Sequence, residues 1–137
     1  MSEKLSSNSQ SSLTAKQLDI LEKKGTEVPF SSSLYYENRP GTYLAADTRK
    51  PVFRSEQKYE SGTGWPSFWA PISPEAIMTK TDTDMGMTRT EVLSTAGGHL
   101  GHVFPDGPKP TGLRYCINGD ALIFVPDEEQ PDNKISK

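Results

Sequence analysis

The chain has 137 residues, of which 33% are hydrophobic and 24% are charged, and its formal net charge is −3. This length suits one domain with a modest core, and the acidic balance argues against nucleic-acid binding. The single cysteine excludes an intramolecular disulfide and a zinc site made of cysteines.

Residues 1–12 are serine-rich and carry few apolar side chains, so we expect a disordered tail. This stretch lacks the apolar segment of a secretory signal, and no apolar run in the chain approaches the roughly 20 residues that cross a membrane. We therefore expect a soluble protein of a reducing compartment, the cytoplasm, with no nucleic acid and no membrane among its partners.

The first ordered element is predicted to be a short helix over residues 15–24. Thr14 and Gln17 match the T-x-x-Q capping box at its start. Lys24 suits the negative end of the helix dipole, and Gly25 suits the position that ends the helix. We expect this helix to be scaffold.

The remainder of the chain predicts a turn-rich, antiparallel β domain. Ser73 and Pro74 favour the start of one further short helix. Asn118 followed by Gly119 is a strong signal for a type I′ hairpin between the last two strands. The predicted strands cover residues 43–45, 52–53, 87–93, 100–104, 113–117 and 121–125. The organisation we predict is a tail over 1–12, a domain over 13–126 and a polar C-terminal tail over 127–137.

The lone cysteine, Cys116, lies on one of these strands, where side chains alternate between two faces. The core-facing side chains are expected to be Leu113, Tyr115 and Ile117. Arg114 and Cys116 then share the other face, and Asn118 joins them if the strand continues. A neighbouring positive charge favours the thiolate, which is the reactive form. The alternative is a buried, unreactive cysteine, and these residues alone leave both interpretations open.

Two histidines, His99 and His102, lie in the segment GGHLGHVF at 97–104. Three-residue spacing on an extended chain directs the two rings to opposite faces, which disfavours a metal site formed by the pair. They are either solvated or core histidines, or acids and hydrogen-bond donors beside a nucleophile.

The segment SGTGWPSF at 61–68 places Trp65 on a glycine-flanked turn. Trp65 fills a core or forms one wall of a pocket for an apolar or thioether group, and Phe68 is expected in the core. Asp106 begins a stiff loop before the cysteine strand. This residue is solvated there or balances the charge of Arg114.

Four segments in order resemble the methionine sulfoxide reductase B family: SGTGWPSF at 61–68, RTEV at 89–92, GGHLGHVFPDG at 97–107 and GLRYCIN at 112–118. The resemblance extends from about Leu13 to Val125. It implies a mainly β fold of two antiparallel sheets with short N-terminal helices. It also implies reduction of methionine-R-sulfoxide, free or in proteins, to methionine, and hence protein repair under oxidative stress.

The resemblance also implies roles for particular residues. Cys116 falls on the family's nucleophile, whose thiolate attacks the sulfoxide sulfur and is left as a sulfenic acid. The positions around the sulfoxide oxygen are His99, His102 and Asn118. Arg114 and Asp106 match positions that tune the thiol. The substrate-binding positions are Trp65 and Phe104.

The sequence departs from the family at its zinc and recycling cysteines. Ala45, Thr48, Ser94 and about Gly97 occupy the positions of two zinc-binding Cys-x-x-Cys pairs, so we expect no structural zinc and no other cofactor. Thr63 occupies the position of the resolving cysteine. An external thiol must then recycle the sulfenic acid: thioredoxin, glutathione with glutaredoxin, or a small dithiol. We expect a monomer.

Two other functions compete with the reductase. The first is a non-catalytic binding module that recognises oxidised or apolar side chains through Trp65. The second is a different thiol enzyme, such as a peroxidase-like protein that forms a sulfenic acid. Retention of Arg114, His102 and Asn118 beside the cysteine favours the reductase.

Overall fold

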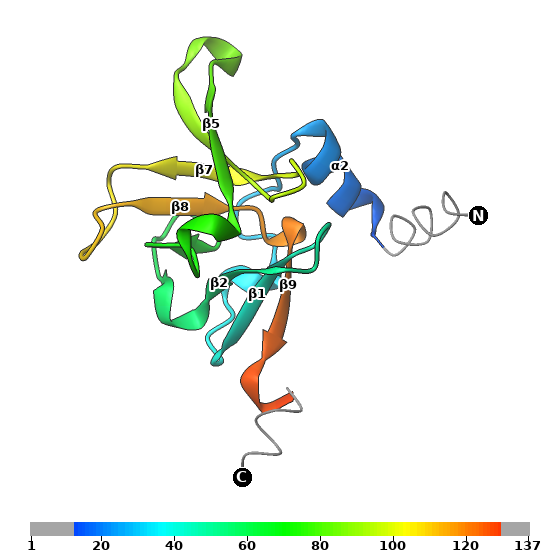
Figure 1. Cartoon of the computed structure of the whole chain (residues 1–137), viewed down its shortest axis with the longest axis vertical. Coiled ribbons are helices and arrows are strands. Elements are labelled where there is room, and N and C mark those ends of the chain that lie inside the picture. The colour runs from blue at the N-terminus through cyan, green and yellow to red at the C-terminus, as the bar shows by residue number, and fades with distance from the viewer. Residues whose placement is uncertain (1–12, 130–137) are drawn as a thin grey trace.

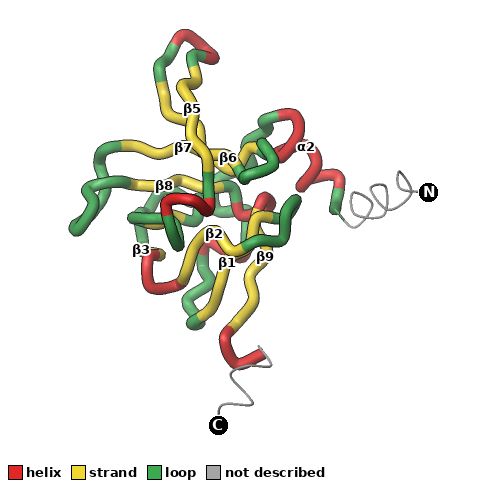
Figure 2. Tube along the Cα trace, in the orientation of Figure 1, coloured by secondary structure: helices red, strands yellow, loops and turns green. Residues whose placement is uncertain are grey.

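The computed structural model describes residues 13–129; the tail expected over 1–12, and residues 130–137 of the C-terminal tail, lie outside the described residues. The described chain forms two antiparallel β-sheets (Figures 1 and 2). The expected mainly β fold with two antiparallel sheets is thus confirmed. Near the N-terminus, residues 13–129 contain one α-helix, where the resemblance implies several.

The small sheet has the strand order β2-β1-β9, and the large sheet has the order β3-β4-β8-β7-β6-β5. The strands of the small sheet are β1 (Gly41–Ala45), β2 (Pro51–Arg54) and β9 (Leu122–Pro126). Those of the large sheet are β3 (Lys58–Tyr59), β4 (Ser67–Phe68), β5 (Met78–Asp82), β6 (Arg89–Leu93), β7 (His99–Phe104) and β8 (Arg114–Ile117). The short 3-10 helices are η1 (Ser33–Tyr35), η2 (Ser55–Gln57), η3 (Pro74–Ala76), η4 (Asp84–Gly86), η5 (Gly119–Ala121) and η6 (Asp127–Glu129).

Helix α2 (Ala15–Lys23) lies against β7 and η5, and begins with the predicted capping box. The Thr14 hydroxyl accepts the Gln17 N–H at 3.1 Å, and the Gln17 side chain accepts the Thr14 N–H at 2.8 Å. The predicted stop at Gly25 is wrong by one residue: Lys24 takes the left-handed conformation with a φ of 61°. Gly25 instead permits a close approach, because a Cβ there would lie 2.2 Å from an Asp19 carboxylate oxygen.

The core lies between the two sheets and is rich in aromatic side chains. Phe53 of β2 stacks on Phe68 of β4 with ring centroids 4.3 Å apart, and Tyr43 of β1 meets the same Phe68 ring edge-on. All three side chains are fully buried, which confirms the prediction for Phe68. Because these rings come from both sheets, their burial is what joins the sheets.

The predicted hairpin at Asn118-Gly119 is wrong. Strands β8 and β9 belong to different sheets, and η5 connects them. A type I′ turn needs a positive φ at both central residues, whereas Asn118 is extended with a φ of −72°. Gly119 serves close packing instead, since a Cβ there would lie 2.0 Å from the Ser32 hydroxyl oxygen.

Other differences concern short or exposed elements. The helix predicted at Ser73 is only the 3-10 turn η3, and Ser73 makes no side-chain cap. Strands β3 and β4 have two residues each, too few for a periodic signal. Strand β5 was not predicted because it is an edge strand: four of its five residues are exposed, so its apolar alternation is missing.

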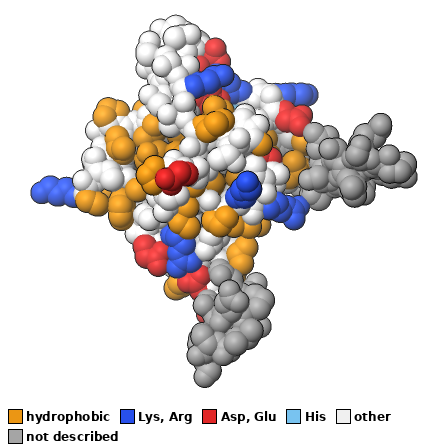
Figure 3. All heavy atoms as spheres, viewed as in Figure 1, with side chains coloured by type: hydrophobic (Ala, Val, Ile, Leu, Met, Phe, Trp, Pro, Cys, Tyr) orange, Lys and Arg blue, Asp and Glu red, His pale blue; other side chains and the backbone are white. Residues whose placement is uncertain are grey.

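The charged side chains on the surface agree with the small net negative charge of the chain. On the face shown in Figure 3, acidic and basic side chains are interspersed around hydrophobic ones, so basic charge is not gathered there. At the C-terminal end, the Asp127 carboxylate accepts a hydrogen bond from the Arg54 guanidinium at 2.8 Å, and this bond connects η6 to the small sheet. Residues 13–129 contain no helix with the length and apolar character needed to traverse a lipid bilayer.

Candidate active site

A pocket of about 320 Å³ lies over β7 and β8 and beside the turn at 61–66. We call it the Cys116 pocket. Its lining residues are Thr26, Thr63, Trp65, Arg89, Gly101, His102, Phe104, Arg114, Cys116 and Asn118. Six of the eight site residues named from the sequence therefore lie around one cavity. The other two, His99 and Asp106, lie outside the lining.

The strand register places Cys116 at the centre of the site. Cys116 pairs with Ser67 of β4 on one side and with His102 of β7 on the other. The predicted alternation holds along β8: Tyr115 and Ile117 are buried in the core, while Arg114 and Cys116 face the pocket. The nucleophile candidate and an imidazole thus lie directly across from each other on adjacent strands.

The thiol is less acidic than the sequence suggested. Burial raises the pKa of Cys116, and this outweighs the Arg114 charge and the hydrogen bonds from Thr63 and Arg114, which lower it. Arg114 is weakened as an electrostatic partner because its guanidinium already donates to Asp106, at 2.9 and 3.1 Å. The guanidinium also lies 4.5 Å from the Phe104 ring centroid. Arg114 therefore lowers the pKa of the thiol, as expected, but burial outweighs this effect and the net shift is upward.

The two histidines lie together, contrary to the expectation of opposite faces. Their ring centroids are 5.3 Å apart. A β-bulge causes this: Val92 pairs with Gly101 but Leu93 pairs with His99, so Leu100 is an extra residue in β7. The bulge turns His99 to the side of His102.

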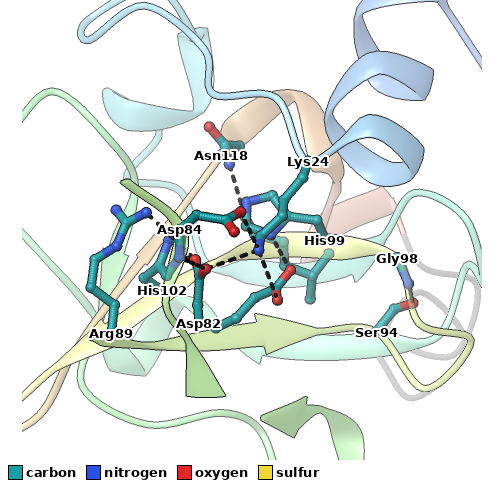
Figure 4. Close-up of polar contacts among 11 residues, drawn as sticks. Lys24, Asp82, Asp84, Arg89, Ser94, Gly98, His99, His102 and Asn118 are labelled. Carbon is teal, nitrogen blue, oxygen red and sulfur yellow. Dashed lines mark hydrogen bonds and ion pairs between the residues drawn. The ribbon is translucent and has the colours of Figure 1, made fainter. Parts of the chain in front are cut away.

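Each histidine meets a buried carboxyl group (Figure 4). His102 Nε2 lies 2.7 Å from Asp82 Oδ2, and His99 Nδ1 lies 2.7 Å from Glu91 Oε2. His99 is 2% exposed and lies behind His102, away from the pocket. Burial lowers the pKa of His99 despite its bond to Glu91, which favours the neutral ring.

Glu27 links Trp65 and Asn118, two residues that line the pocket, and no sequence pattern indicated this role. Its backbone oxygen accepts the Trp65 indole N–H at 3.0 Å. Its backbone N–H donates to the Asn118 side-chain oxygen at 2.9 Å. Because Asn118 also donates one N–H to the Leu100 oxygen at 3.1 Å, a single side-chain N–H of Asn118 is left for a ligand. Glu27 lies in a loop without periodicity, so only the fold reveals this link.

The structure also brings charged residues to the site for which the sequence predicted no role. Arg89 and Glu91 belong to the segment RTEV, and the structure places them beside the histidines. Lys24 at the C-cap of α2 and Asp82 at the end of β5 meet at 3.0 Å. We call the set Lys24, Asp82, Asp84, Arg89, Glu91, His99 and His102 the histidine network. Alternation along β5 and β6 could have placed Asp82, Arg89 and Glu91 on one face once the strands were known.

The positions expected to lack zinc ligands offer no metal donors. Ala45 and Ser94 are fully buried, and neither they nor Thr48 and Gly97 carry a thiol or imidazole. The Ser94 hydroxyl is engaged elsewhere, since it donates to Asp47 Oδ2 at 2.7 Å and accepts the Gly98 N–H at 3.0 Å. Over residues 13–129, no three His, Cys, Asp or Glu side chains gather in a metal-binding arrangement. The donor set does not fit zinc.

Comparison with known proteins covers nearly the whole chain. The family model described as the SelR domain matches residues 13–126. Peptide methionine sulfoxide reductase MsrB of Methanosarcina mazei is 47% identical over 133 residues, 96% of this chain and 95% of that protein. The protein of that name from Methanosarcina barkeri is 52% identical over 118 residues, 85% of this chain and 83% of that protein. The one from Agrobacterium fabrum is 48% identical over 115 residues, 83% of this chain and 85% of that protein.

Proposed function

Because the chain belongs to the methionine sulfoxide reductase B family, we infer that it is a peptide-methionine (R)-S-oxide reductase with Cys116 as its nucleophile. One observation carries the assignment to Cys116: the only cysteine of the chain opens into a pocket directly across from His102. The substrate is methionine-R-sulfoxide, free or in a protein, and the role is repair under oxidative stress.

The chemistry requires a thiolate, a proton donor and a place for the S-methyl group. Cys116 attacks the sulfoxide sulfur; in the net reaction the substrate S–O bond breaks and an S–O bond forms at Cys116 Sγ. Two electrons pass from the cysteine sulfur to the methionine sulfur, and the thiol proton ends on the sulfenic oxygen. Methionine leaves, and Cys116 is left as a sulfenic acid.

The pocket supplies these requirements from different sides. His102 gives the proton to the sulfoxide oxygen, and the free N–H of Asn118 donates to the same oxygen. The Trp65 ring, held by its bond to Glu27, and the Phe104 ring form apolar walls for the methyl group. Arg114 opposes the effect of burial on the thiol. Asp106 and His99 act through Arg114 and His102.

Recycling needs a thiol from outside the chain. No second cysteine is present, and Thr63, at the family's resolving position, lines the pocket beside Cys116. The sulfenic acid is attacked by thioredoxin, glutathione with glutaredoxin, or a small dithiol, which releases water. Dependence on such thiols suits the cytoplasm. As for assembly, we propose that the enzyme works as a monomer.

The domain is stable without structural zinc. The hydrogen bonds of Ser94 with Asp47 and Gly98 join the two turns that carry the family's zinc positions. Burial of Ser94 protects these bonds from competition by water.

A single-turnover assay without recycling thiol tests the function. The protein and Cys116→Ser are mixed separately with the R and S epimers of a methionine sulfoxide derivative. One equivalent of methionine is expected from the R epimer only, with a sulfenic acid at Cys116 and no product from the variant. No product from either epimer would contradict the reductase and favour a binding module. Peroxide consumption without sulfoxide reduction would favour a peroxidase-like enzyme.

A further inference from the structure

Two buried carboxyl groups lie behind the Cys116 pocket and touch the two histidines. The Asp82 side chain is 1% exposed and the Glu91 side chain 3% exposed. A buried carboxylate is costly unless charged or hydrogen-bonding groups surround it. Asp82 has four such partners: Lys24 Nζ at 3.0 Å, the Asp84 N–H at 2.9 Å, His102 Nε2 at 2.7 Å and, more distantly, Arg89 Nη2 at 3.5 Å.

The strand register brings these groups to one face of the large sheet. Asp82 pairs with Arg89, and Glu91 pairs with His102. Lys24 arrives from the C-terminal end of α2, where its ammonium group lies 2.9 Å from Asp84 and 3.6 Å from Glu91. Figure 4 shows the Lys24 side chain reaching the Asp82 and Asp84 carboxyl groups, with His102 bonded to Asp82. Four places in the fold, β5, β6, η4 and the C-cap of α2, therefore supply the charges around the histidines.

Two cations lie beside the two buried carboxyl groups of the network. Lys24 contacts Asp82 and Glu91, and Arg89 contacts Asp82. Bonds to Asp84 and Asp82 raise the pKa of Lys24, so Lys24 stays charged. Of the two imidazoles, only that of His102 lines the Cys116 pocket, whereas burial lowers the pKa of His99 and favours its neutral ring. His102 is therefore the histidine placed to exchange a proton with a substrate in the pocket.

The Asp82 carboxylate also determines which nitrogen of His102 serves the pocket. Bonds from His102, from the Asp84 backbone and from Lys24 hold the pKa of Asp82 well below its usual range. An ionised carboxylate only accepts, so Nε2 of His102 must carry a hydrogen and donate it to Asp82. Nδ1 is then the nitrogen left for a ligand in the pocket.

We propose that Asp82, supported by Lys24, is a positioning residue that holds His102 as the proton donor of the reaction. This inference rests on the proposed function. The His102 imidazolium gives its Nδ1 proton to the sulfoxide oxygen as the Cys116 thiolate attacks. The oxygen leaves the methionine sulfur with that proton and ends on Cys116 Sγ, while His102 becomes neutral and keeps its Nε2–H bond to Asp82. Asp82 touches neither the substrate nor the reacting sulfur.

The effect of pH on the single-turnover rate tests this role. The proposal predicts a rate that rises with pH as the thiol ionises and falls again on an alkaline limb, where the proton donor of the reaction is lost. In Asp82→Asn the alkaline limb should move to lower pH by about one unit or more, because the cation loses its carboxylate partner. The rate at neutral pH should fall about tenfold or more, with little change in the substrate concentration at half-saturation.

The variant Lys24→Met should shift the alkaline limb in the direction opposite to that of Asp82→Asn. Removing a cation near His102 should move the alkaline limb to higher pH, by less than the Asp82→Asn shift, because Lys24 acts on His102 through Asp82. The matched control is Asp84→Asn, because the exposed Asp84 side chain bonds the same Lys24 and contacts no histidine. The alkaline limb of this variant should lie at nearly the same pH as that of the unchanged protein. Shifts of equal sign in Asp82→Asn and Lys24→Met, or no shift in either, would overturn the proposal.

A second readout does not depend on catalysis. The chain has two histidines, so the ring nitrogen spectrum of histidine-labelled protein contains two imidazoles. Above the alkaline limb, the neutral His102 ring should be the Nε2–H form, and Asp82→Asn should mix the two forms. A pure Nδ1–H form in the unchanged protein would overturn the proposal. If the protein released no methionine from either epimer, the proposed function would fail while this spectrum still reported on Asp82. Should Asp82→Asn not fold, Lys24→Met carries the test.

Discussion

At Cys116, burial and charge act on the thiol in opposite directions. Burial raises the pKa of the thiol and prevails over Arg114, whose guanidinium is shared with the exposed Asp106. The thiolate fraction, and with it the alkylation rate, rises with pH, so the half-rise should lie at higher pH in the folded protein than in the unfolded chain. The reactivity of Cys116 therefore depends on how far Arg114 is occupied by Asp106.

Two variants should change this reactivity in opposite directions. Asp106→Asn frees the Arg114 charge to act on Cys116, so iodoacetamide should modify Cys116 about two- to fivefold faster at neutral pH. Arg114→Gln removes the charge and should slow the modification. Alkylation of Cys116, followed by intact mass, measures both. A slower reaction in Asp106→Asn would show that Asp106 supports the thiolate in a different way.

The position of Thr63 leads to a prediction about how the Cys116 sulfenic acid is resolved. Its side chain hydrogen-bonds Cys116 and lines the same pocket. A thiol in Thr63→Cys should reach the Cys116 sulfenic acid and close a disulfide, with loss of water. After one turnover the variant should resist a sulfenic-acid reagent and show the mass of a disulfide. Thr63→Ser and the unchanged protein, which lack the second thiol, should both react with the reagent.

Among the elements, strand β7 decides the form of the site. Its bulge at Leu100 brings His99 beside His102, and its Gly101 lets β8 approach closely. A Cβ at Gly101 would lie 2.1 Å from the Cys116 backbone oxygen, so no side chain fits there without moving the strands apart. The distance between His102 and Cys116 thus depends on a backbone contact that only glycine allows.

Gly101→Ala should therefore weaken both stability and activity. We expect the free energy of unfolding to fall by about 2–3 kcal/mol, because the backbone of β8 must shift. Urea denaturation measures this loss, and the single-turnover assay measures the effect on the site. Thr90→Ala, an exposed change on the neighbouring β6, should stay within about 0.5 kcal/mol of the unchanged protein. Equal stability of the two variants would contradict the close-packing argument.

For the molecule as a whole, hydrogen bonds join the two turns where the family resemblance implies zinc-binding cysteines in many members. Asp47 and Ser94 come from turns beside the small and the large sheet respectively, so their 2.7 Å bond links the two sheets at a distance from the aromatic core. The aromatic core and this bond hold the sheets together at different points.

Stability should then depend on Ser94 and not on metal. Ser94→Ala should lower the free energy of unfolding by about 1–3 kcal/mol, since the half-buried Asp47 carboxylate and the buried Gly98 N–H both lose the hydroxyl that they bond. Thr95→Ala, the exposed neighbour, is the matched control. A strong chelator should leave the melting temperature unchanged, and metal analysis should find no stoichiometric zinc. A chelator-dependent loss of stability would contradict the absence of structural zinc.

Local sequence determined the features that depend on near neighbours. The capping box of α2 formed as predicted, because Thr14 and Gln17 need only each other. The side chains around Cys116 alternated between two faces as predicted, because the apolar Tyr115 and Ile117 are stabilised by burial in the core. The four family segments carried most pocket residues, since chemistry restricts which side chains can surround the nucleophile.

Only the tertiary structure decided the features that depend on distant partners. The Asn118-Gly119 hairpin did not form, because Glu27 and Leu100 capture the Asn118 side chain and the last two strands enter different sheets. The histidines met because β7 must bulge to match its neighbour. The contact between Asp82 and Lys24 joins residues that no local pattern connects. Charge and strand register act through space, so these contacts became visible only once the chain was folded.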